Sequence, residues 1–333
     1  MVLNNSKMRM PLLASLNPLV HALVHRLLLA VLLLWGVSLL IFIAVNFLPG
    51  DYAATALGKT ATPETIASVR HSLGLDRPLI TRYISWSLQI LQGDFGHSWA
   101  GQQDVGKQLW HRLGNSLWLA GCSALLAIPL AIIGGLLAVR YLHRLPDRII
   151  TLISLVALSL PEFFIGYLLI MTLVVHAGIS TFPSTIYDGM SLSDRLAAML
   201  LPVLTLTIAV LANMLRSARS ALMSVTQSPW METAKLKGLP PLRILWRHAL
   251  PNAIAPVLTV VAMNLAALIV GAMIVEVIFV YPGVGQYMVD AVTVRDIPVV
   301  QACGLVFAAI YILFNLLVDI LMMLANPRMR LPR

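Results

Sequence analysis

The sequence predicts an all-α integral membrane protein with six transmembrane helices, and both its composition and its apolar stretches support this fold class. The chain has 333 residues, of which 59% are hydrophobic and only 11% are charged, and its mean hydropathy is +0.86. A soluble domain carries about 25% charged residues, so the composition argues against a soluble enzyme and against a disordered chain. A helix needs about 20 mostly apolar residues to cross the hydrocarbon core, and six stretches reach that length.

The first stretch is the one that could be mistaken for a signal peptide. It contains no charged residue and has 22 residues, whereas the apolar region of a signal peptide has about 7 to 15, so we expect a retained helix. Pro161 and Pro256 interrupt the third and fifth stretches, which a helix bundle tolerates because neighbouring helices satisfy the freed backbone groups. The predicted spans are 27–48, 115–139, 149–176, 196–215, 253–280 and 300–325.

The positive charges predict the orientation of these spans. With the N-terminus inside, the inner segments carry 15 Lys and Arg residues and the outer segments carry 8, six of them in one long loop. Cytoplasmic loops carry the excess of Lys and Arg, so we expect a cytoplasmic segment 1–26, a cytoplasmic tail 326–333 and both termini inside. The net charge of +9 is thereby explained by topology, and nucleic acid is not expected as a partner.

The longer outer segment, 51–114, is expected to form a small folded cap. Thr62 suits an N-cap, Pro63 the first position of a helix, and Gly74 its end. The cap is too short to be a catalytic domain.

The longer inner segment, 216–252, predicts a helix–turn–helix on the cytoplasmic face. Ser228 suits an N-cap, Pro229 the first helical position, and Gly238 the end of the first helix. Pro240 and Pro241 begin a second short helix that we expect to run to about residue 250. An isolated helix pair this short is marginally stable in water, so we expect it to pack against another surface. The sequence of the segment does not distinguish between a partner protein and lipid headgroups as that surface.

At this segment the sequence resembles the permeases of ABC importers. Their EAA signature reads Glu-Ala-Ala, three residues, Gly, nine residues, then Ile-x-Leu-Pro. Here Glu232-Thr233-Ala234 is followed at the same spacing by Gly238 and by His248-Ala249-Leu250-Pro251, with Thr233 and His248 departing from the pattern. Further matches to the dipeptide, oligopeptide and nickel branch extend along the chain: Leu48-Pro49-Gly50-Asp51, Leu73–Pro78, Gly93–Ser98, Glu276–Gly285, Arg295–Gln301 and Asn326-Pro327-Arg328.

This resemblance implies a type I importer permease of the bacterial inner membrane, with a five-helix core over 115–325. Such importers combine two permease subunits, here expected to be different chains, with two cytoplasmic ATPases and an extracytoplasmic substrate-binding protein. ATP and Mg²⁺ would bind the ATPase subunits, so no cofactor is expected in this chain. The segment 228–251 would dock on an ATPase. The residues that the resemblance assigns to coupling are Glu232, Thr233, Ala234, Gly238, His248, Leu250 and Pro251.

Three acidic residues fall within the predicted spans, where charge is costly enough to suggest function. Glu162 follows the helix-breaking Pro161 and is a candidate for lining the transport pathway. Glu276 lies near the outer end of its span and is expected to order the outer gate or a helix contact rather than to bind substrate. Asp319 could pair with inner arginines or with a neighbouring helix.

The sequence offers no catalytic or metal-binding constellation. Cys122 and Cys303 lie in apolar runs without ligand spacing. His21 and His25 are four residues apart, but no third ligand accompanies them, so an interfacial helix explains them better than a metal site. No Ser/His/Asp or paired-carboxylate site can be assembled, so this chain is not expected to be an enzyme.

The resemblance implies that this chain is a subunit of an ATP-driven importer of small peptides or a related solute. Such an importer works by alternating access. One alternative is the same architecture importing nickel or a metal chelate. The alternative from another class is an ion-coupled carrier that uses the three membrane acids, although such carriers often show inverted repeats and none is evident here.

Overall fold

The computed structural model describes residues 18–47, 52–57, 61–179, 181–187 and 189–325, and their regular structure is helical. Within these residues the only β-type pairing is an isolated bridge between His97 and Asp104. The predicted tail 326–333, most of segment 1–26 and the Leu48–Asp51 match lie outside the described residues.

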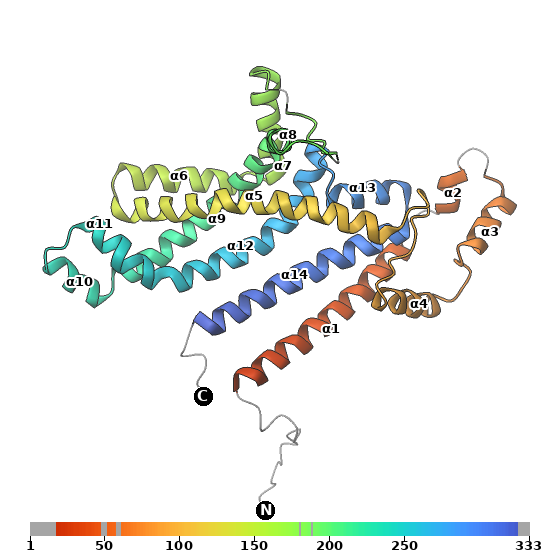
Figure 1. The fold of residues 1–333 in the computed structure, drawn as a ribbon, viewed down its shortest axis with the longest axis horizontal. Coiled ribbons are helices and arrows are strands. Elements are labelled where there is room, and N and C mark those ends of the chain that lie inside the picture. The colour runs from red at the N-terminus through yellow and green to blue at the C-terminus, as the bar shows by residue number, and fades with distance from the viewer. Residues whose placement is uncertain (1–17, 48–51, 58–60, 180, 188, 326–333) are drawn as a thin grey trace, which may run out of the picture.

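Five long apolar helices and one bent pair make up the membrane part (Figure 1). The long helices are α1 (Pro18–Asn46), α5 (Val105–Arg140), α9 (Leu200–Thr226), α12 (Leu250–Phe279) and α14 (Ile297–Ala325). The bent pair joins α6 (Leu145–Ser159) to α7 (Glu162–Leu169) and the π-helix η2 (Ile170–His176). If the bent pair counts as one span, the described residues contain six, as the sequence predicts.

The shorter helices cluster at the two ends of the bundle (Figure 1). The cap end carries α2 (Tyr52–Leu57), α3 (Pro63–Ser72), α4 (Leu79–Leu91) and α13 (Val284–Val294), whereas the opposite end, the α10 end, carries α10 (Pro229–Leu236), α11 (Pro241–Arg243) and η3 (Ile244–Ala249). Helix α8 (Leu192–Ala198) precedes α9. The start of α3 is as predicted, because Thr62 accepts a hydrogen bond from Thr65 N and Pro63 begins the helix.

Two helices extend about three turns beyond the predicted spans. Helix α5 begins at Val105 rather than near residue 115, because Asp104 caps it and accepts a hydrogen bond from Lys107 N at 3.0 Å. The last part of the predicted cap is therefore an extension of α5. Helix α9 continues past residue 215 to Thr226, so Arg216 and Arg219 lie on a helix rather than in a loop.

The third span is broken rather than merely interrupted. Its halves meet at an angle of 103° around Pro161. Leu160 is extended, with φ −98° and ψ 127°, because the ring of a following proline disfavours the helical region. Pro161 therefore redirects the chain and places Glu162 in the first turn of a new helix.

Helices α5, α9 and α12 form the centre of the bundle, and α1 packs against α14 beside it. All three central helices contribute to one buried cluster that includes Leu119, Leu206 and Leu268. Small residues let α5 and α9 approach closely: a Cβ on Gly135 would lie 3.2 Å from the Cβ of Ala218.

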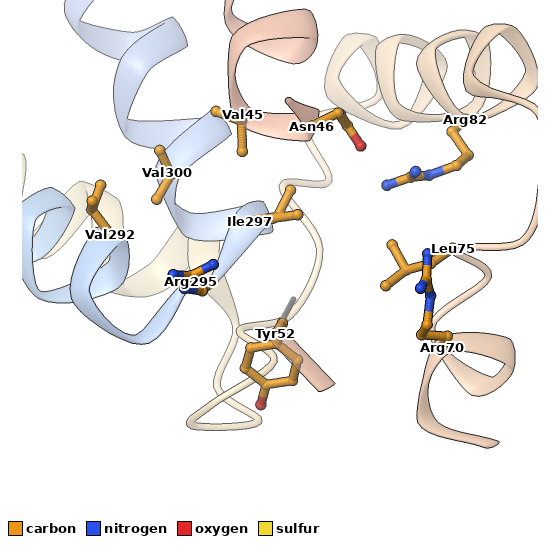
Figure 2. Close-up of a pocket in the computed structure, with 10 residues that line it drawn as sticks. All are labelled: Val45, Asn46, Tyr52, Arg70, Leu75, Arg82, Val292, Arg295, Ile297 and Val300. Carbon is orange, nitrogen blue, oxygen red and sulfur yellow. The ribbon is translucent and has the colours of Figure 1, made fainter. Parts of the chain in front are cut away.

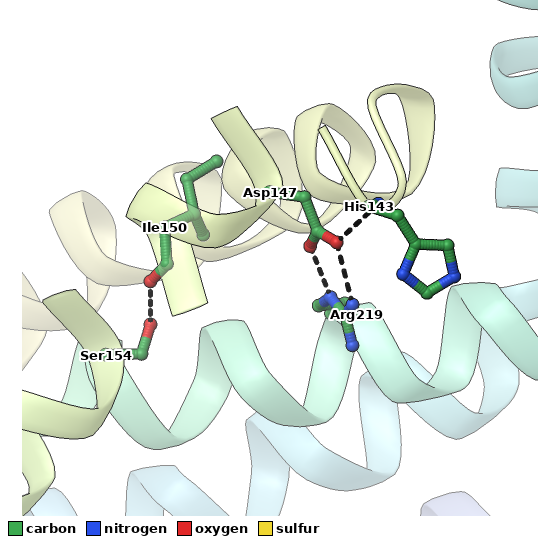
Figure 3. A network of polar contacts seen from close by, with 5 residues as sticks. All are labelled: His143, Asp147, Ile150, Ser154 and Arg219. Atoms are coloured by element: carbon green, nitrogen blue, oxygen red, sulfur yellow. Dashed lines mark hydrogen bonds and ion pairs between the residues drawn. The ribbon is translucent and has the colours of Figure 1, made fainter. Parts of the chain in front are cut away.

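A buried ion pair fastens α6 to α9 near the α10 end (Figure 3). Arg219 donates from Nε to Oδ1 of Asp147 at 2.8 Å and from Nη2 to Oδ2 at 3.0 Å, and the backbone N–H of His143 donates to Oδ2 at 3.0 Å. Only 5% of the Asp147 side chain is exposed, against 25% for Arg219. Two parallel charge-assisted bonds fix orientation as well as distance, so the pair sets the position of α6 on α9.

This geometry predicts that Arg219→Met destabilises the protein strongly. The change leaves the buried Asp147 carboxylate with a single backbone donor, and removing one partner of a buried pair costs about 3–5 kcal/mol. The matched control is Arg216→Met, which alters an exposed arginine on the same helix. Unfolding of the purified protein in detergent measures both. Equal stability of the two variants would contradict the role of the pair, and Asp147→Asn combined with Arg219→Met should recover part of the loss.

Candidate functional site

Helix α10 is anchored to the bundle chiefly by Met231. This side chain is 0% exposed and belongs to a cluster with Leu136 of α5, Leu222 of α9, Ile244 of η3 and Ala253 of α12, against which Ala234 also packs. Only Gln227 and Ser228 separate α9 from α10. The Ser228 hydroxyl donates to the Val225 carbonyl oxygen at 2.5 Å, which ties the turn to the end of α9. Helix α10 therefore has little freedom to move independently of α9.

The opposite face of α10 is open. Glu232 and Thr233 are exposed, while Trp230 is 44% exposed and Leu236 is 88% exposed. A surface of apolar and acidic side chains next to a buried anchor suits docking to another protein.

Gly238 ends α10 in the left-handed region, with φ +71°, and nothing lies within 4 Å of where its Cβ would be. The glycine is thus required by its backbone conformation and not by crowding. This agrees with the predicted helix end.

The predicted second short helix is not a separate element. Helix α11 leads into η3, and η3 runs directly into α12, which begins at Leu250. Pro251 directly follows the π-helix η3, at the second residue of α12. His248 is half-buried in η3. The predicted helix–turn–helix is therefore one short helix followed by the start of a membrane helix, because the chain stays helical through Pro251.

Glu276 lies at the other end of α12, in a space that two glycines create. It is 1% exposed and accepts a hydrogen bond from the Gly285 N–H at 2.6 Å. A Cβ on Gly283 would lie 2.1 Å from the carboxyl carbon of Glu276, and one on Gly285 would lie 2.6 Å from the Cα of Met273. Glu276 thus joins α12 to the turn that precedes α13.

Neighbouring contacts fasten the same turn to α5. Asn115 donates from Nδ2 to the Pro282 carbonyl oxygen at 3.0 Å and accepts from Nη2 of Arg195 at 2.7 Å. The buried Tyr281 hydroxyl donates to the carbonyl oxygen of Asn115 at 3.0 Å. Burial raises the pKa of Tyr281 well above its ordinary value, so the hydroxyl keeps its proton and remains a donor.

Asp296 fastens the cap to the start of α14. It is 2% exposed and accepts hydrogen bonds from Ser98 Oγ at 2.5 Å, from Trp99 N at 3.1 Å and from Ala100 N at 3.2 Å. Two stretches that the sequence singled out, Gly93–Ser98 and Arg295–Gln301, therefore meet in space.

The two other membrane acids have different surroundings. The half-buried Glu162 lies against α12, since a Cβ on Gly271 would be 2.6 Å from its Oε2. That oxygen is buried and has no hydrogen-bond partner among the described residues. Asp319 of α14 forms an ion pair with Arg26 of α1, one of the inner arginines that the sequence offered as its partner.

Sequence reasoning missed several polar contacts that join the helices. Asp147 with Arg219 and Ser98 with Asp296 are 72 and 198 residues apart in the chain. Asn213 of α9 donates to Asn264 of α12 at 3.0 Å inside the bundle. The sequence gave one indication of these contacts: each of these polar residues lies in or beside an apolar helix, where polar groups need hydrogen-bond partners.

The described residues hold no group of three His, Cys, Asp or Glu side chains that could bind a metal ion. Cys122 and Cys303 are free thiols there. The arrangement at both ends is one of helix contacts, with an exposed face on α10 and with Asp147, Glu276, Asp296 and Asp319 joining separate elements.

Comparison with known proteins gives consistent matches over most of the chain. Residues 127–331 match the family of binding-protein-dependent transport system inner membrane components, and residues 19–120 match the N-terminal region of such membrane components. The chain is 36% identical over 297 residues to the glutathione transport system permease protein GsiC of Escherichia coli K12, covering 89% of this chain and 94% of that protein. It is also 36% identical over 294 residues to GsiC of Salmonella typhi, covering 88% and 94% of the two chains. This chain therefore belongs to the inner-membrane permease components of binding-protein-dependent ABC importers.

Proposed function

We propose that this chain is the permease subunit of an importer that carries short peptides, glutathione foremost, across the inner membrane. The observation that carries the proposal is the 36% identity to glutathione permeases along nearly the whole of both chains. In this proposal both termini and α10 face the cytoplasm, in keeping with the excess of Lys and Arg at that end. Neither nickel nor ion-coupled carriage gains support from these relatives.

The proposed partners are a second permease chain, two ATPase subunits and an extracytoplasmic binding protein. ATP and Mg²⁺ would bind the ATPases. The family description, which names a binding-protein-dependent system, supports a binding protein as partner. The exposed face of α10, with Trp230, Glu232 and Leu236, is where we place the ATPase, and the remaining motif residues (Thr233, Ala234, Gly238, His248, Leu250 and Pro251) position that face.

The proposed mechanism is alternating access driven through α10. Because Met231 shares a buried cluster with residues of α9, η3 and α12, and η3 continues into α12, a displacement of α10 by the ATPases would move α9 and α12. Glu162 lies beside Gly271 in the second half of α12, so the same movement would change the surroundings of this carboxyl group. We assign Glu162 to the pathway, Glu276 to the outer gate and Asp319 to the α1–α14 contact.

Replacing Gly238 by Val should uncouple transport. The left-handed backbone at this position costs a residue with a side chain about 1–2 kcal/mol, and α10 would change its direction to relieve it. We expect uptake to fall about ten-fold at normal protein levels. The control is Gly178→Val, a glycine with φ +68° and open space around it, outside the α10 segment. Wild-type uptake by Gly238→Val would refute the coupling role.

Replacing Glu162 by Gln should lower uptake without lowering stability. The amide keeps the shape of the side chain but removes a charge beside Gly271. Uptake and the melting temperature, measured on the same preparations, separate the two effects. Glu64→Gln, which changes an exposed acid in the first turn of α3, serves as the control. If the Glu162→Gln protein transports at the wild-type rate, Glu162 is not part of the pathway.

Uptake of labelled glutathione should require ATP and not an ion gradient. In cells depleted of ATP while the ion gradient is held, we expect uptake to stop, because the driving force comes from the partner ATPases. Excess unlabelled dipeptide tests whether the substrate class is wider than glutathione. Continued uptake without ATP would favour an ion-coupled carrier, and ATP-dependent transport that excludes glutathione would overturn only the substrate assignment.

A further inference from the structure

A pocket near the turn before α13 is lined by α5, by the loop that follows η2 and by α8. Its volume is about 460 Å³, within the range of about 300–1,000 Å³ that is typical of small-molecule sites. Arg195 of α8 contributes a guanidinium group to its wall, and the described lining residues include no Asp or Glu. A cation without an acid beside it favours a ligand that carries a carboxylate.

Arg195 is held in place by groups that do not neutralise its charge. Nη2 donates to Oδ1 of Asn115 at 2.7 Å, and the guanidinium carbon lies 5.9 Å from the centroid of the Trp118 ring. The ion pairs found among the described residues involve other side chains. Nε of Arg195 is buried and has no hydrogen-bond partner there. A partly desolvated cation gains more from a bound anion than a fully hydrated one does.

The pocket between α3, α4 and the start of α14 differs in this respect (Figure 2). Its volume is about 300 Å³, and Arg70, Arg82 and Arg295 line it. However, Arg70 and Arg295 already interact with other residues. We therefore assign no ligand to that pocket.

The other walls of the Arg195 pocket suit the uncharged part of a solute. Trp118, Tyr187 and Leu192 line it and are 44%, 68% and 63% exposed. The pocket thus offers one charged group among aromatic and apolar side chains, which matches a short peptide that ends in a carboxylate. The γ-glutamyl end of glutathione carries an ammonium group beside its carboxylate, and Arg195 would repel that group. The glycyl end therefore fits better.

The loop that forms one wall of the pocket also contacts the helix beside Glu162. Ser184 donates from its backbone N–H to the Phe279 carbonyl oxygen at 2.9 Å, and the rings of Phe182 and Phe279 lie 6.4 Å apart between centroids. Phe279 ends α12, and Gly271, which lies against Glu162, is about 12 Å back along the same helix. The pocket is therefore close to the cap-side end of the pathway that we assign to Glu162.

Arg195 is also joined to the turn that we assign to the outer gate. Asn115, which accepts from Arg195, donates to the Pro282 carbonyl oxygen at 3.0 Å. Glu276 holds the same turn through the Gly285 N–H. A carboxylate bound to Arg195 would compete with Asn115 for the guanidinium group, so an occupied pocket would loosen one of the contacts of this turn.

We propose that this pocket receives the C-terminal carboxylate of the peptide solute at Arg195, before the solute passes to Glu162. The assignment rests on the proposed function, because it takes the cargo to be a peptide. An acidic side chain of the binding protein carries the same chemical group, so the experiment must distinguish these two sources of the carboxylate.

Proteoliposomes that contain the whole importer, supplied with its binding protein, test the site with labelled glutathione and with its glycyl carboxamide. Loss of a charge-assisted hydrogen bond should make kcat/KM of the wild type for the amide about ten-fold lower than for the acid. Arg195→Gln should lower kcat/KM for the acid about ten-fold and abolish this preference, whereas Arg195→Lys should keep part of it. The same binding protein delivers both solutes to every variant, so a change in preference comes from this chain.

A second variant separates binding from the structural contact with Asn115. Leu192 is exposed and lies three residues before Arg195 on α8, a spacing at which side chains on a helix meet. Leu192→Glu supplies a competing carboxylate while Arg195 remains, and we expect uptake of the acid to fall about ten-fold. Leu192→Gln is the matched control and should transport like the wild type. Arg77→Gln, which changes an exposed arginine that does not line the pocket, should do the same.

Each contrary result has a distinct meaning. An unchanged preference for the acid in Arg195→Gln, or equal uptake by Leu192→Glu and Leu192→Gln, overturns the site while the proposed function stands. If Arg195→Gln keeps the preference but no longer retains the binding protein in a pull-down, the carboxylate belongs to the binding protein and the solute site is wrong. A wild-type importer that takes up neither glutathione nor any other short peptide overturns the proposed function, and this site with it.

Discussion

The burial of Met231 in a cluster with residues of α5, α9, η3 and α12 is the contact on which the rest of the arrangement depends. It places a short helix outside the apolar bundle while burying one of its side chains completely. A helix of eight residues is marginal by itself, so tertiary contact must supply its stability. Any force on α10 is therefore passed to the helices that hold it, and a loop in the same place would absorb that force.

Helical continuity on both sides makes this transmission direct. Two residues join α9 to α10, and η3 continues into α12 without a break. Helix α12 has 30 residues, which corresponds to about 45 Å. It continues from η3, which contacts α10, passes Glu162 at Gly271 and ends at Phe279, just after Glu276, whose buried carboxylate holds the turn before α13. One rigid element thus connects the surface of α10 to the contacts at the cap end.

The spans were predictable because hydrocarbon thickness sets their apolar length, but their ends were not. Apolar residues mark only the part of a helix inside the membrane, whereas α5 and α9 continue beyond it. Asp104 starts α5 by capping, and the arginines of α9 continue it because arginine is a good helix former. The sequence predicted an interruption at Pro161 but not the 103° bend there, because a proline indicates where a helix breaks and does not determine the angle between its halves.

The candidate site likewise contains residues that the local sequence identifies and residues whose partners are distant in the chain. Gly238 and the residues around Glu232 were found because a glycine helix end and a fixed spacing are properties of the local sequence. The partners of Asp147 and Asp296 are distant in the chain, and nothing local identifies them. A charged carboxylate is costly to bury without donors, so both acids were expected to have partners, but only the folded arrangement of helices identifies them. These are the contacts that fix α6 and the cap on the bundle, whereas α10 keeps an exposed, structured face, which is the face that the proposed coupling to an ATPase requires.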